Sequence, residues 1–179
     1  QFGRELWFAG GAWSWCGFAP HNHFSMKTMK PAMRQVRNHG VRNVLITVWG
    51  DDGHDCSYFS VLPALYAIRR YGEGEFDEAE IRKGFGELFG LNFDDFLLLD
   101  LPNRNQKNPD YARASNFCKS LLFNDCFLGL RDVAMEEMGH IPFAEYADAL
   151  RGAAPKMGGY ACLFENLAAL CELLEIKAE

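Results

Sequence analysis

The stretch Val44-Leu45-Ile46-Thr47-Val48-Trp49-Gly50-Asp51-Asp52-Gly53 decides the fold. Its apolar run stops at a tryptophan, and two carboxylates follow on a loop bracketed by glycines. Strands that are buried on both faces are nearly continuous in Val, Ile and Leu, and in α/β barrels the functional side chains lie where such strands end. The run therefore predicts a buried strand that delivers Trp49, Asp51 and Asp52 to a binding site.

A second segment of the same design lies nearer the N-terminus. Glu5-Leu6-Trp7-Phe8-Ala9-Gly10-Gly11-Ala12-Trp13-Ser14-Trp15 is again apolar and ends in aromatic residues. Flat aromatic faces stack on the C–H faces of sugar rings, and carboxylates accept hydrogen bonds from sugar hydroxyls. Two such strand ends side by side predict a sugar-type binding site made by Trp13, Trp15 and the residues from Trp49 onward.

The residues between the two segments predict a helix. Within residues 25–39 apolar side chains recur at helical spacing, and Gly40 follows as a C-terminal stop. A strand–helix–strand unit connects parallel neighbours through a right-handed crossover, which predicts an α/β fold for this part of the chain. Residues 58–71 predict a second covering helix after the loop at Asp51 and Asp52.

From Glu73 onward helical patterns dominate, and no further strand of comparable quality is predicted. Asp77 with Glu80 and Asn92 with Asp95 resemble capping boxes. The sequence therefore predicts two units, residues 1–72 with the strands and residues 73–179 as an all-α subdomain. Within the second unit we expect an exposed polar loop at residues 101–109 and amphipathic helices at residues 111–138, 142–151 and 159–177.

Two parallel strands with apolar faces make a poor sheet by themselves, because a buried parallel sheet needs further strands at its edges. We therefore expect the missing strands upstream of residue 1. The chain is interpreted as the C-terminal portion of a (β/α)8 barrel, namely two parallel strands with their covering helices, followed by the all-α subdomain.

Composition narrows the classes of partner. The chain has 179 residues, 49% of them hydrophobic, and a formal net charge of -6. Without a long Lys/Arg block it is not expected to bind nucleic acid. Its apolar runs are far shorter than the roughly 18 residues that suggest a membrane span, and no secretory signal is visible.

The six cysteines lack a CxxC pair and lie in apolar surroundings. This pattern favours free buried thiols in a reducing compartment, so we expect a cytoplasmic protein. Cys118 and Cys126 have no nearby histidine, which argues against a zinc site.

The ordered set Trp7–Trp15, Gly17–Asn22 and Trp49–Cys56 resembles the closing strands of a glycoside hydrolase family 20 β-N-acetylhexosaminidase, in a branch with a helical C-terminal extension. The resemblance implies a (β/α)8 barrel that removes terminal N-acetylglucosamine or N-acetylgalactosamine from glycans with retention of configuration. It also implies substrate-assisted catalysis, in which the acetamido oxygen of the substrate attacks the anomeric carbon, and it implies no cofactor.

The resemblance assigns roles to four positions and leaves a fifth open. Trp49 matches the tryptophan that forms a wall of the sugar pocket, and Trp13 matches the end of the preceding strand, with Trp15 as its neighbour. Asp51 matches the residue that binds the outer hydroxyls of the terminal sugar, and Asp52 is the alternative. The general acid Glu and its partner Asp are expected upstream of residue 1, so this chain alone is expected to be inactive.

Each candidate also has a simpler interpretation. Trp49 would fill a barrel core. Either Asp51 or Asp52 would accept hydrogen bonds from backbone N–H groups of the turn. Asp55 and Ser57 are expected to be N-caps of the following helix. The segment His21–His23 lacks the third ligand of a zinc site, so hydrogen bonding within a loop is the better interpretation.

Two other functions stay open at this point. The aromatic and acidic surface would also suit a non-catalytic carbohydrate-binding or structural module. Alternatively, the helical part mediates homodimerisation, for which exposed aromatic faces in residues 111–138 would be the clue.

Overall fold

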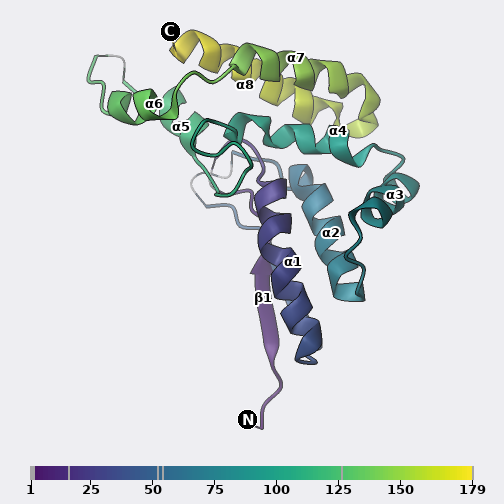
Figure 1. The fold of residues 1–179 in the computed structure, drawn as a ribbon. Coiled ribbons are helices and arrows are strands. Elements are labelled where there is room, and N and C mark those ends of the chain that lie inside the picture. Colours follow the sequence, from purple (N-terminus) through teal and green to yellow (C-terminus); the bar gives the residue numbers. More distant parts are fainter. Residues whose placement is uncertain (1–2, 16, 52, 54, 126, 179) are drawn as a thin grey trace.

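A computed structural model describes residues 3–15, 17–51, 53, 55–125 and 127–178. The molecule is elongated, with the strands near the N-terminal end and the helices α7 (Phe143–Ala153) and α8 (Ala161–Ala178) at the opposite end (Figure 1). Among the described residues, no helix is both long and apolar enough to cross a bilayer.

The predicted strand–helix–strand unit is confirmed. Strands β1 (Trp7–Gly11) and β2 (Asn43–Thr47) are parallel and pair in the register Trp7↔Asn43 to Gly11↔Thr47. Helix α1 (Asn22–Asn38) connects them and packs on the sheet. Gly10 permits this close approach, because a Cβ there would lie 2.4 Å from Cε of Met29. The register brings the C-terminal ends of both strands together.

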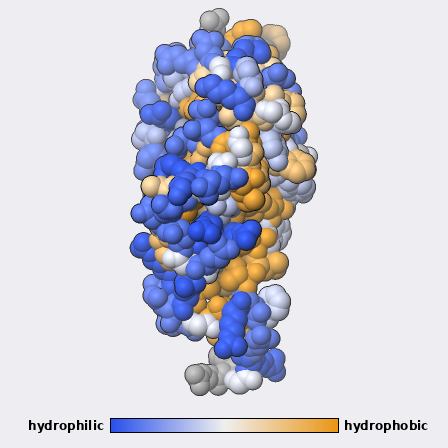
Figure 2. All heavy atoms as spheres, turned by 90° about the vertical axis from the view of Figure 1, so that its right-hand side faces the viewer, coloured by the Kyte–Doolittle hydropathy of each residue, from blue (hydrophilic) through white to orange (hydrophobic). Residues whose placement is uncertain are grey.

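The prediction that the strand at residues 44–49 is buried on both faces is wrong for this chain. Val44 and Leu45 are 36% and 52% exposed, and Trp7 on β1 is 66% exposed. The reason is that each strand has a single neighbour in the described sheet, and helices cover one face only. A long apolar band is also visible on the side of the molecule shown in Figure 2.

The second covering helix is confirmed, with a 3-10 turn at its start. Residues Tyr58–Val61 form η1, and α2 (Leu62–Glu73) follows and packs against α1. Helix α2 ends at Gly74, whose φ of +98° lies in the left-handed region that favours glycine.

The two predicted caps are confirmed at the start of the helical part. Asp77 caps α3 (Glu78–Phe89) by accepting the N–H groups of Ala79 and Glu80. Asn92 caps α4 (Phe93–Leu97) by accepting the N–H of Asp95 at 2.8 Å. A 3-10 segment, η2 (Leu98–Asn103), continues directly from α4.

The segment 101–109 is exposed only in part: Arg104, Gln106, Lys107 and Pro109 are exposed, as its composition predicts, but its asparagines are buried. Asn103, Asn105 and Asn108 are 3%, 8% and 4% exposed. Their amides bind backbone groups: Asn108 accepts the N–H of Arg113 and donates to its carbonyl, each at 3.0 Å. The polar residues therefore serve as internal hydrogen-bond partners of irregular backbone.

The single long helix expected at residues 111–138 is also wrong. The structure has two short helices instead, α5 (Phe117–Leu122) and α6 (Asp132–Met138). Between them Asp125 accepts the N–H groups of Phe127 and Leu128, and Gly129 has a φ of +58°. A side chain that bonds the backbone locally competes with the helical pattern, which explains the interruption.

The expected helices at residues 142–151 and 159–177 are confirmed as α7 and α8, joined by the short turns η3 (Ala154–Lys156) and η4 (Gly158–Tyr160). Phe96 of α4 is fully buried, with its ring centroid 5.6 Å from those of Tyr160 and Phe164. One cluster of buried apolar residues runs from Ala12 to Leu174, so both parts of the chain contribute to a shared core.

Candidate functional site

Three of the predicted site residues lie together at the C-terminal ends of the two strands. Trp15 stacks on Trp13 with ring centroids 5.1 Å apart, and its centroid lies 6.3 Å from that of Trp49. Trp15 is thus the central ring of the cluster. This arrangement follows from the parallel register, because Gly11 and Thr47 are directly paired at the strand ends.

Trp49 is 52% exposed and its indole is held by a short-range contact. Its Nε1–H donates to Oγ1 of Thr47 at 2.6 Å, and its carbonyl accepts a hydrogen bond from Oγ of Ser14 at 3.2 Å. The first contact orients the ring, and the second ties the loop after β2 to the loop after β1. Half of the indole remains available to a ligand.

Two hydrogen bonds of its own backbone fix the position of Trp13. Its N–H donates to Oγ of Ser25 at 2.8 Å, and its carbonyl accepts the N–H of His21 at 2.9 Å. The Ser25 hydroxyl in turn donates to the carbonyl of His21 at 2.7 Å. The ring of Trp13 meets Phe24 edge-on at 4.9 Å. The first turn of α1 therefore fixes the loop that carries Trp13.

Of the two acidic candidates, Asp51 and Asp52, the structure describes only Asp51. Asp51 is exposed, while Asp52, and His54 of the same loop, lie outside the described residues. Ser57 is the N-cap of η1, as predicted, and accepts the N–H of Phe59. Asp55 does not cap this turn but forms an ion pair with Lys119 of α5 at 2.6 Å. The loop after β2 is thereby attached to the helical part of the chain.

Residues 21–23 form a hydrogen-bond network, as the simpler interpretation predicts, but they lie at the start of helix α1 and not in a loop. Nε2 of His21 lies 2.8 Å from the nitrogen and 2.9 Å from the carbonyl oxygen of Ser115. Burial lowers the pKa of His21, and Asp100 opposes this effect only in part, so the ring is neutral. No three His, Cys, Asp or Glu side chains of the described residues lie close enough together to hold a metal ion.

Asp100 is the central acceptor of this network, and sequence reasoning missed it. Its carboxylate is fully buried. Oδ1 accepts the backbone N–H and the side-chain amide of Asn22, both at 3.0 Å, and Oδ2 lies 2.7 Å from both the backbone nitrogen and Nδ1 of His23. The available signal was a single acidic residue within the apolar run Phe96–Leu101.

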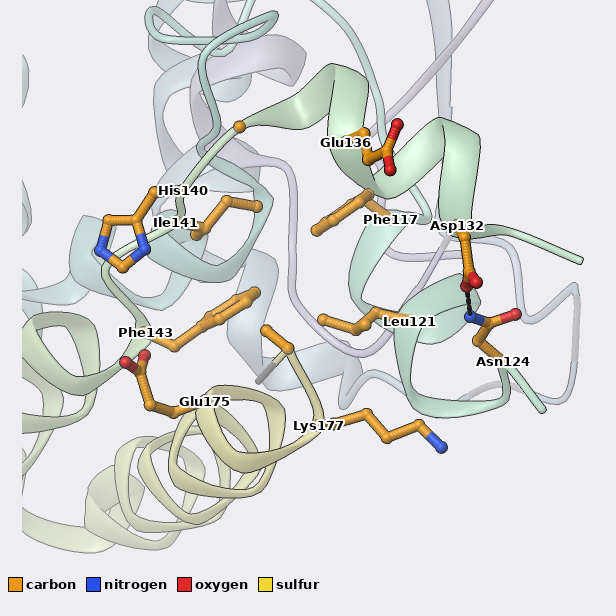
Figure 3. Close-up of a pocket in the computed structure, with 12 residues that line it drawn as sticks. Phe117, Leu121, Asn124, Asp132, Glu136, His140, Ile141, Phe143, Glu175 and Lys177 are labelled. Atoms are coloured by element: carbon orange, nitrogen blue, oxygen red, sulfur yellow. Dashed lines mark hydrogen bonds between the residues drawn. The ribbon is translucent and has the colours of Figure 1, made fainter. Parts of the chain in front are cut away.

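A separate cleft of about 900 Å³ opens between helices α5, α6, α7 and α8 (Figure 3). Its floor is apolar, and carboxylates stand at its rim. None of the predicted site residues lines it, so it is distinct from the tryptophan cluster. Its principal residues are Phe117, Leu121, Ile141 and Phe143 on the floor and Asp132, Glu136, His140 and Glu175 around it.

The described residues between Phe123 and Val133 expose much apolar surface beside α6 (Figure 1). The ring of Phe123 contacts Phe18, in the loop after β1, at 6.1 Å between centroids. The exposed fractions in this segment are 70% for Phe123, 95% for Phe127, 69% for Leu128, 78% for Leu130 and 71% for Val133.

Comparison with protein families identifies the helical part. Residues 94–179 match the family described as Glycoside Hydrolase 20C C-terminal domain. The match begins inside α4 and covers α5 to α8, including the buried Asp100. A search of the curated proteins found no match to this chain. The match over residues 94–179 therefore supports, from the other half of the sequence, the resemblance to glycoside hydrolase family 20 seen in the strand region.

Proposed function

We propose that this chain is part of a retaining exo-β-N-acetylhexosaminidase that removes terminal N-acetylglucosamine or N-acetylgalactosamine from glycans. The observation that carries the proposal is the convergence of Trp13, Trp15 and Trp49 from two adjacent parallel strand ends, in a chain whose residues 94–179 match the Glycoside Hydrolase 20C C-terminal domain. Aromatic faces at strand ends are what a sugar pocket requires.

In this proposal residues 1–72 are the last two strand–helix units of a (β/α)8 barrel, and residues 73–179 are the helical subdomain. The exposed apolar side chains of both strands support the barrel, because further strands and their side chains would cover them. Leu6 and Trp7 are each 66% exposed, and Leu45 is 52% exposed. Open apolar surface of this extent is costly in water.

The proposed roles follow from position. The indole of Trp49 forms a wall that presses the acetamido group toward the anomeric carbon. Trp13 and Trp15 extend the same aromatic surface, and Asp51 or Asp52 accepts hydrogen bonds from the outer hydroxyls. The carboxylic acid that protonates the leaving oxygen comes from an earlier strand of the barrel, and the reaction uses no cofactor.

The test uses the complete enzyme that contains this chain. Trp49→Ala is expected to lower kcat on aryl N-acetyl-β-glucosaminides by about 100-fold or more, because positioning of the reacting group supplies much of the rate. Trp49→Phe, which keeps an aromatic face, is expected to lose less. Near-normal turnover in Trp49→Ala contradicts the assignment.

A second variant tests the carboxylate. Asp51→Asn is expected to raise KM for both gluco- and galacto-configured substrates, because an amide accepts fewer hydroxyl hydrogen bonds than a carboxylate. Asp94→Asn on the distant helix α4, where Asp94 pairs with Arg82, is the matched control and is expected to keep the KM. An unchanged KM in Asp51→Asn would show that Asp51 does not bind the outer hydroxyls of the sugar.

We also propose that the complete protein is a homodimer whose interface includes the segment Phe123–Val133. The five apolar side chains of this segment expose roughly 700 Å², against about 800 Å² per partner in a standard interface. A second copy of the chain supplies a surface of equal size and character.

Light scattering on the eluting protein measures the mass directly. A dimer is expected, and Phe127→Glu together with Leu130→Glu is expected to give monomers because charges cannot be buried unpaired in an apolar interface. A wild-type protein that elutes as a monomer at micromolar concentration refutes the proposal.

The proposed location is a reducing compartment such as the cytoplasm. Four cysteines of the described residues (Cys56, Cys118, Cys162 and Cys171) have free thiols. Burial raises the pKa of Cys56 to about 12 and that of Cys171 to about 12, so these thiols stay protonated and unreactive. Cys162, contrary to the expectation of burial, is exposed on α8.

A further inference from the structure

We infer that Asp100 is a positioning residue for the tryptophan cluster: a buried carboxylate of the helical part caps α1 from outside and so fixes the loop that carries Trp13 and Trp15. The kinetic part of this inference rests on the proposed function, whereas its structural part does not. Asp100 lies 78 residues after Asn22 in the sequence, so the two are joined only by the fold.

Helix α1 lacks a cap of its own. Its N-cap residue, His21, makes no side-chain capping bond, and its first turn contains no acidic residue. The first backbone N–H groups of a helix need an external acceptor. Asp100 supplies it, since Oδ1 accepts the N–H of Asn22 at 3.0 Å and Oδ2 accepts that of His23 at 2.7 Å. A negative charge at this end also suits the helix dipole.

The carboxylate is itself held in one position. Besides the two backbone groups, it meets the side-chain amide of Asn22 and Nδ1 of His23. The His23 ring in turn stacks on Tyr111, with centroids 4.4 Å apart and planes 12° apart. A fully buried carboxylate with four hydrogen-bonding contacts cannot shift without losing several of them at once.

The path from Asp100 to the indoles is short. Both backbone groups of Trp13 are bonded to the first turn of α1, through Oγ of Ser25 and the N–H of His21. A displacement of that turn therefore moves Trp13, and Trp15 moves with it through the stacking contact of 5.1 Å. Trp15 is the ring neighbour of Trp49, so the whole cluster responds.

The same network also fixes the helix after β2. The amide of Asn22 donates to the carbonyl of Ser60 at 3.0 Å, and its Oδ1 accepts the N–H of Ala64, in the first turn of α2, at 3.2 Å. A further amide from η2, that of Asn103, donates to the carbonyl of Pro20 at 2.7 Å. The side chain of Asn22, which Asp100 holds, thus links the start of α1 to the start of α2.

The main test is Asp100→Asn in the complete enzyme. The variant keeps the size of the side chain but turns an NH2 group toward backbone donors. We expect kcat/KM to fall about tenfold or more at a temperature where circular dichroism shows the variant to be folded, because small displacements in a site are costly.

The matched control is Asp77→Ala, which removes the local cap of α3. It is expected to lower the melting temperature but to keep kcat/KM within about twofold, because the exposed carboxylate of Asp77 accepts the N–H groups of Ala79 and Glu80 in its own helix. Equal losses of kcat/KM in the two variants would show that Asp100 matters only for stability and would overturn the inference.

A double-mutant cycle gives a readout that a purely structural role would not move. If Asp100 acts through Trp13, Asp100→Asn should cost little further activity in a Trp13→Ala background, whereas additive losses contradict the inference. Should Asp100→Asn fail to fold, Ser25→Ala interrupts the same path nearer the site. It is expected to lower kcat/KM with the same non-additivity, and an unchanged kcat/KM would overturn the inference.

A spectroscopic measurement separates this inference from the proposed function. Stacked indoles contribute to near-ultraviolet circular dichroism, so Asp100→Asn should change this signal while Asp77→Ala preserves it. A wild-type enzyme without hexosaminidase activity refutes the proposed function alone. An Asp100→Asn spectrum equal to that of the wild type refutes the positioning role alone.

Discussion

Thr47→Val is the change that tests the orientation of Trp49 most directly. Oγ1 of Thr47 accepts the indole N–H of Trp49 at 2.6 Å and donates to the carbonyl of Gly10 at 3.0 Å. Valine has the same branched shape and suits a strand equally well. The substitution therefore removes two hydrogen bonds and leaves the packing of β2 in place.

The magnitude follows from those two bonds. A hydrogen bond contributes about 1 kcal/mol net, so the loss of both lowers the free energy of unfolding by about 1–2 kcal/mol. The bond to Trp49 has a second effect, because this indole is half-exposed and its nearest described ring contact, with Trp15, has a centroid distance of 6.3 Å. Releasing the indole should cost a ligand about 1 kcal/mol, or about fivefold in affinity.

The assay is titration of the complete enzyme with an N-acetylhexosamine inhibitor, followed by chemical unfolding of the same samples. Thr28→Val is the matched control, because Thr28 is the other threonine of the chain and is exposed on α1. It should leave both affinity and stability within error. If Thr47→Val loses stability but keeps full affinity, the indole of Trp49 does not contact the sugar.

Three further predictions follow from the described contacts. Phe96→Ala should lower the free energy of unfolding by about 3–5 kcal/mol, because it empties a fully buried site, whereas Leu88→Ala, at a side chain that is 59% exposed, should cost less than about 1 kcal/mol in the same unfolding titration. Because burial lowers the pKa of His21 below 6.5, the unfolded chain binds a proton that the folded chain does not as the pH falls through 6.5. The free energy of unfolding should therefore decrease below that pH, and His21→Gln should flatten the decrease. The 179-residue chain alone should hydrolyse no aryl N-acetyl-β-glucosaminide, and reproducible activity would mean that it contains its own general acid.

The elements with local signals could be predicted from the sequence. Both strands, α1, α2 and the caps at Asp77 and Asn92 follow from patterns within a few residues. The exposure of Val44 and Leu45 could not, because a strand pattern does not tell whether its neighbours are part of the same chain. The aromatic and β-branched residues therefore predict the strands correctly, but they do not predict that Val44 and Leu45 are exposed.

The helical pattern at residues 111–138 failed for a different reason. Apolar residues recur there at helical spacing, yet Asp125 offers its carboxylate to two backbone N–H groups and Gly129 adopts a positive φ. These local alternatives break the helix, and the apolar side chains of Phe127 and Leu128 become exposed instead of packed. Spacing alone does not weigh such competing bonds.

The sequence predicts the three tryptophans of the candidate site, but it does not predict the buried Asp100 that holds the neighbouring helix. Parallel strand ends predict that Trp13, Trp15 and Trp49 meet, although the central place of Trp15 depends on the path of the loop. The role of Asp100 depends on a contact across 78 residues, for which no local pattern exists. A single acidic residue in an apolar run is nevertheless a useful warning that a carboxylate is buried.

The remote cap of α1 also bears on how the protein is made. A ribosome adds about 5–20 residues per second, so Asp100 is synthesised roughly 4–16 s after Asn22, which it must eventually meet. During that interval the nascent helix has its leading amides open to water, and the loop with Trp13 has no fixed base. The order of translation therefore delays completion of the aromatic surface until Asp100 has been synthesised, and a chain stalled before Asp100 is left with an unsupported tryptophan cluster.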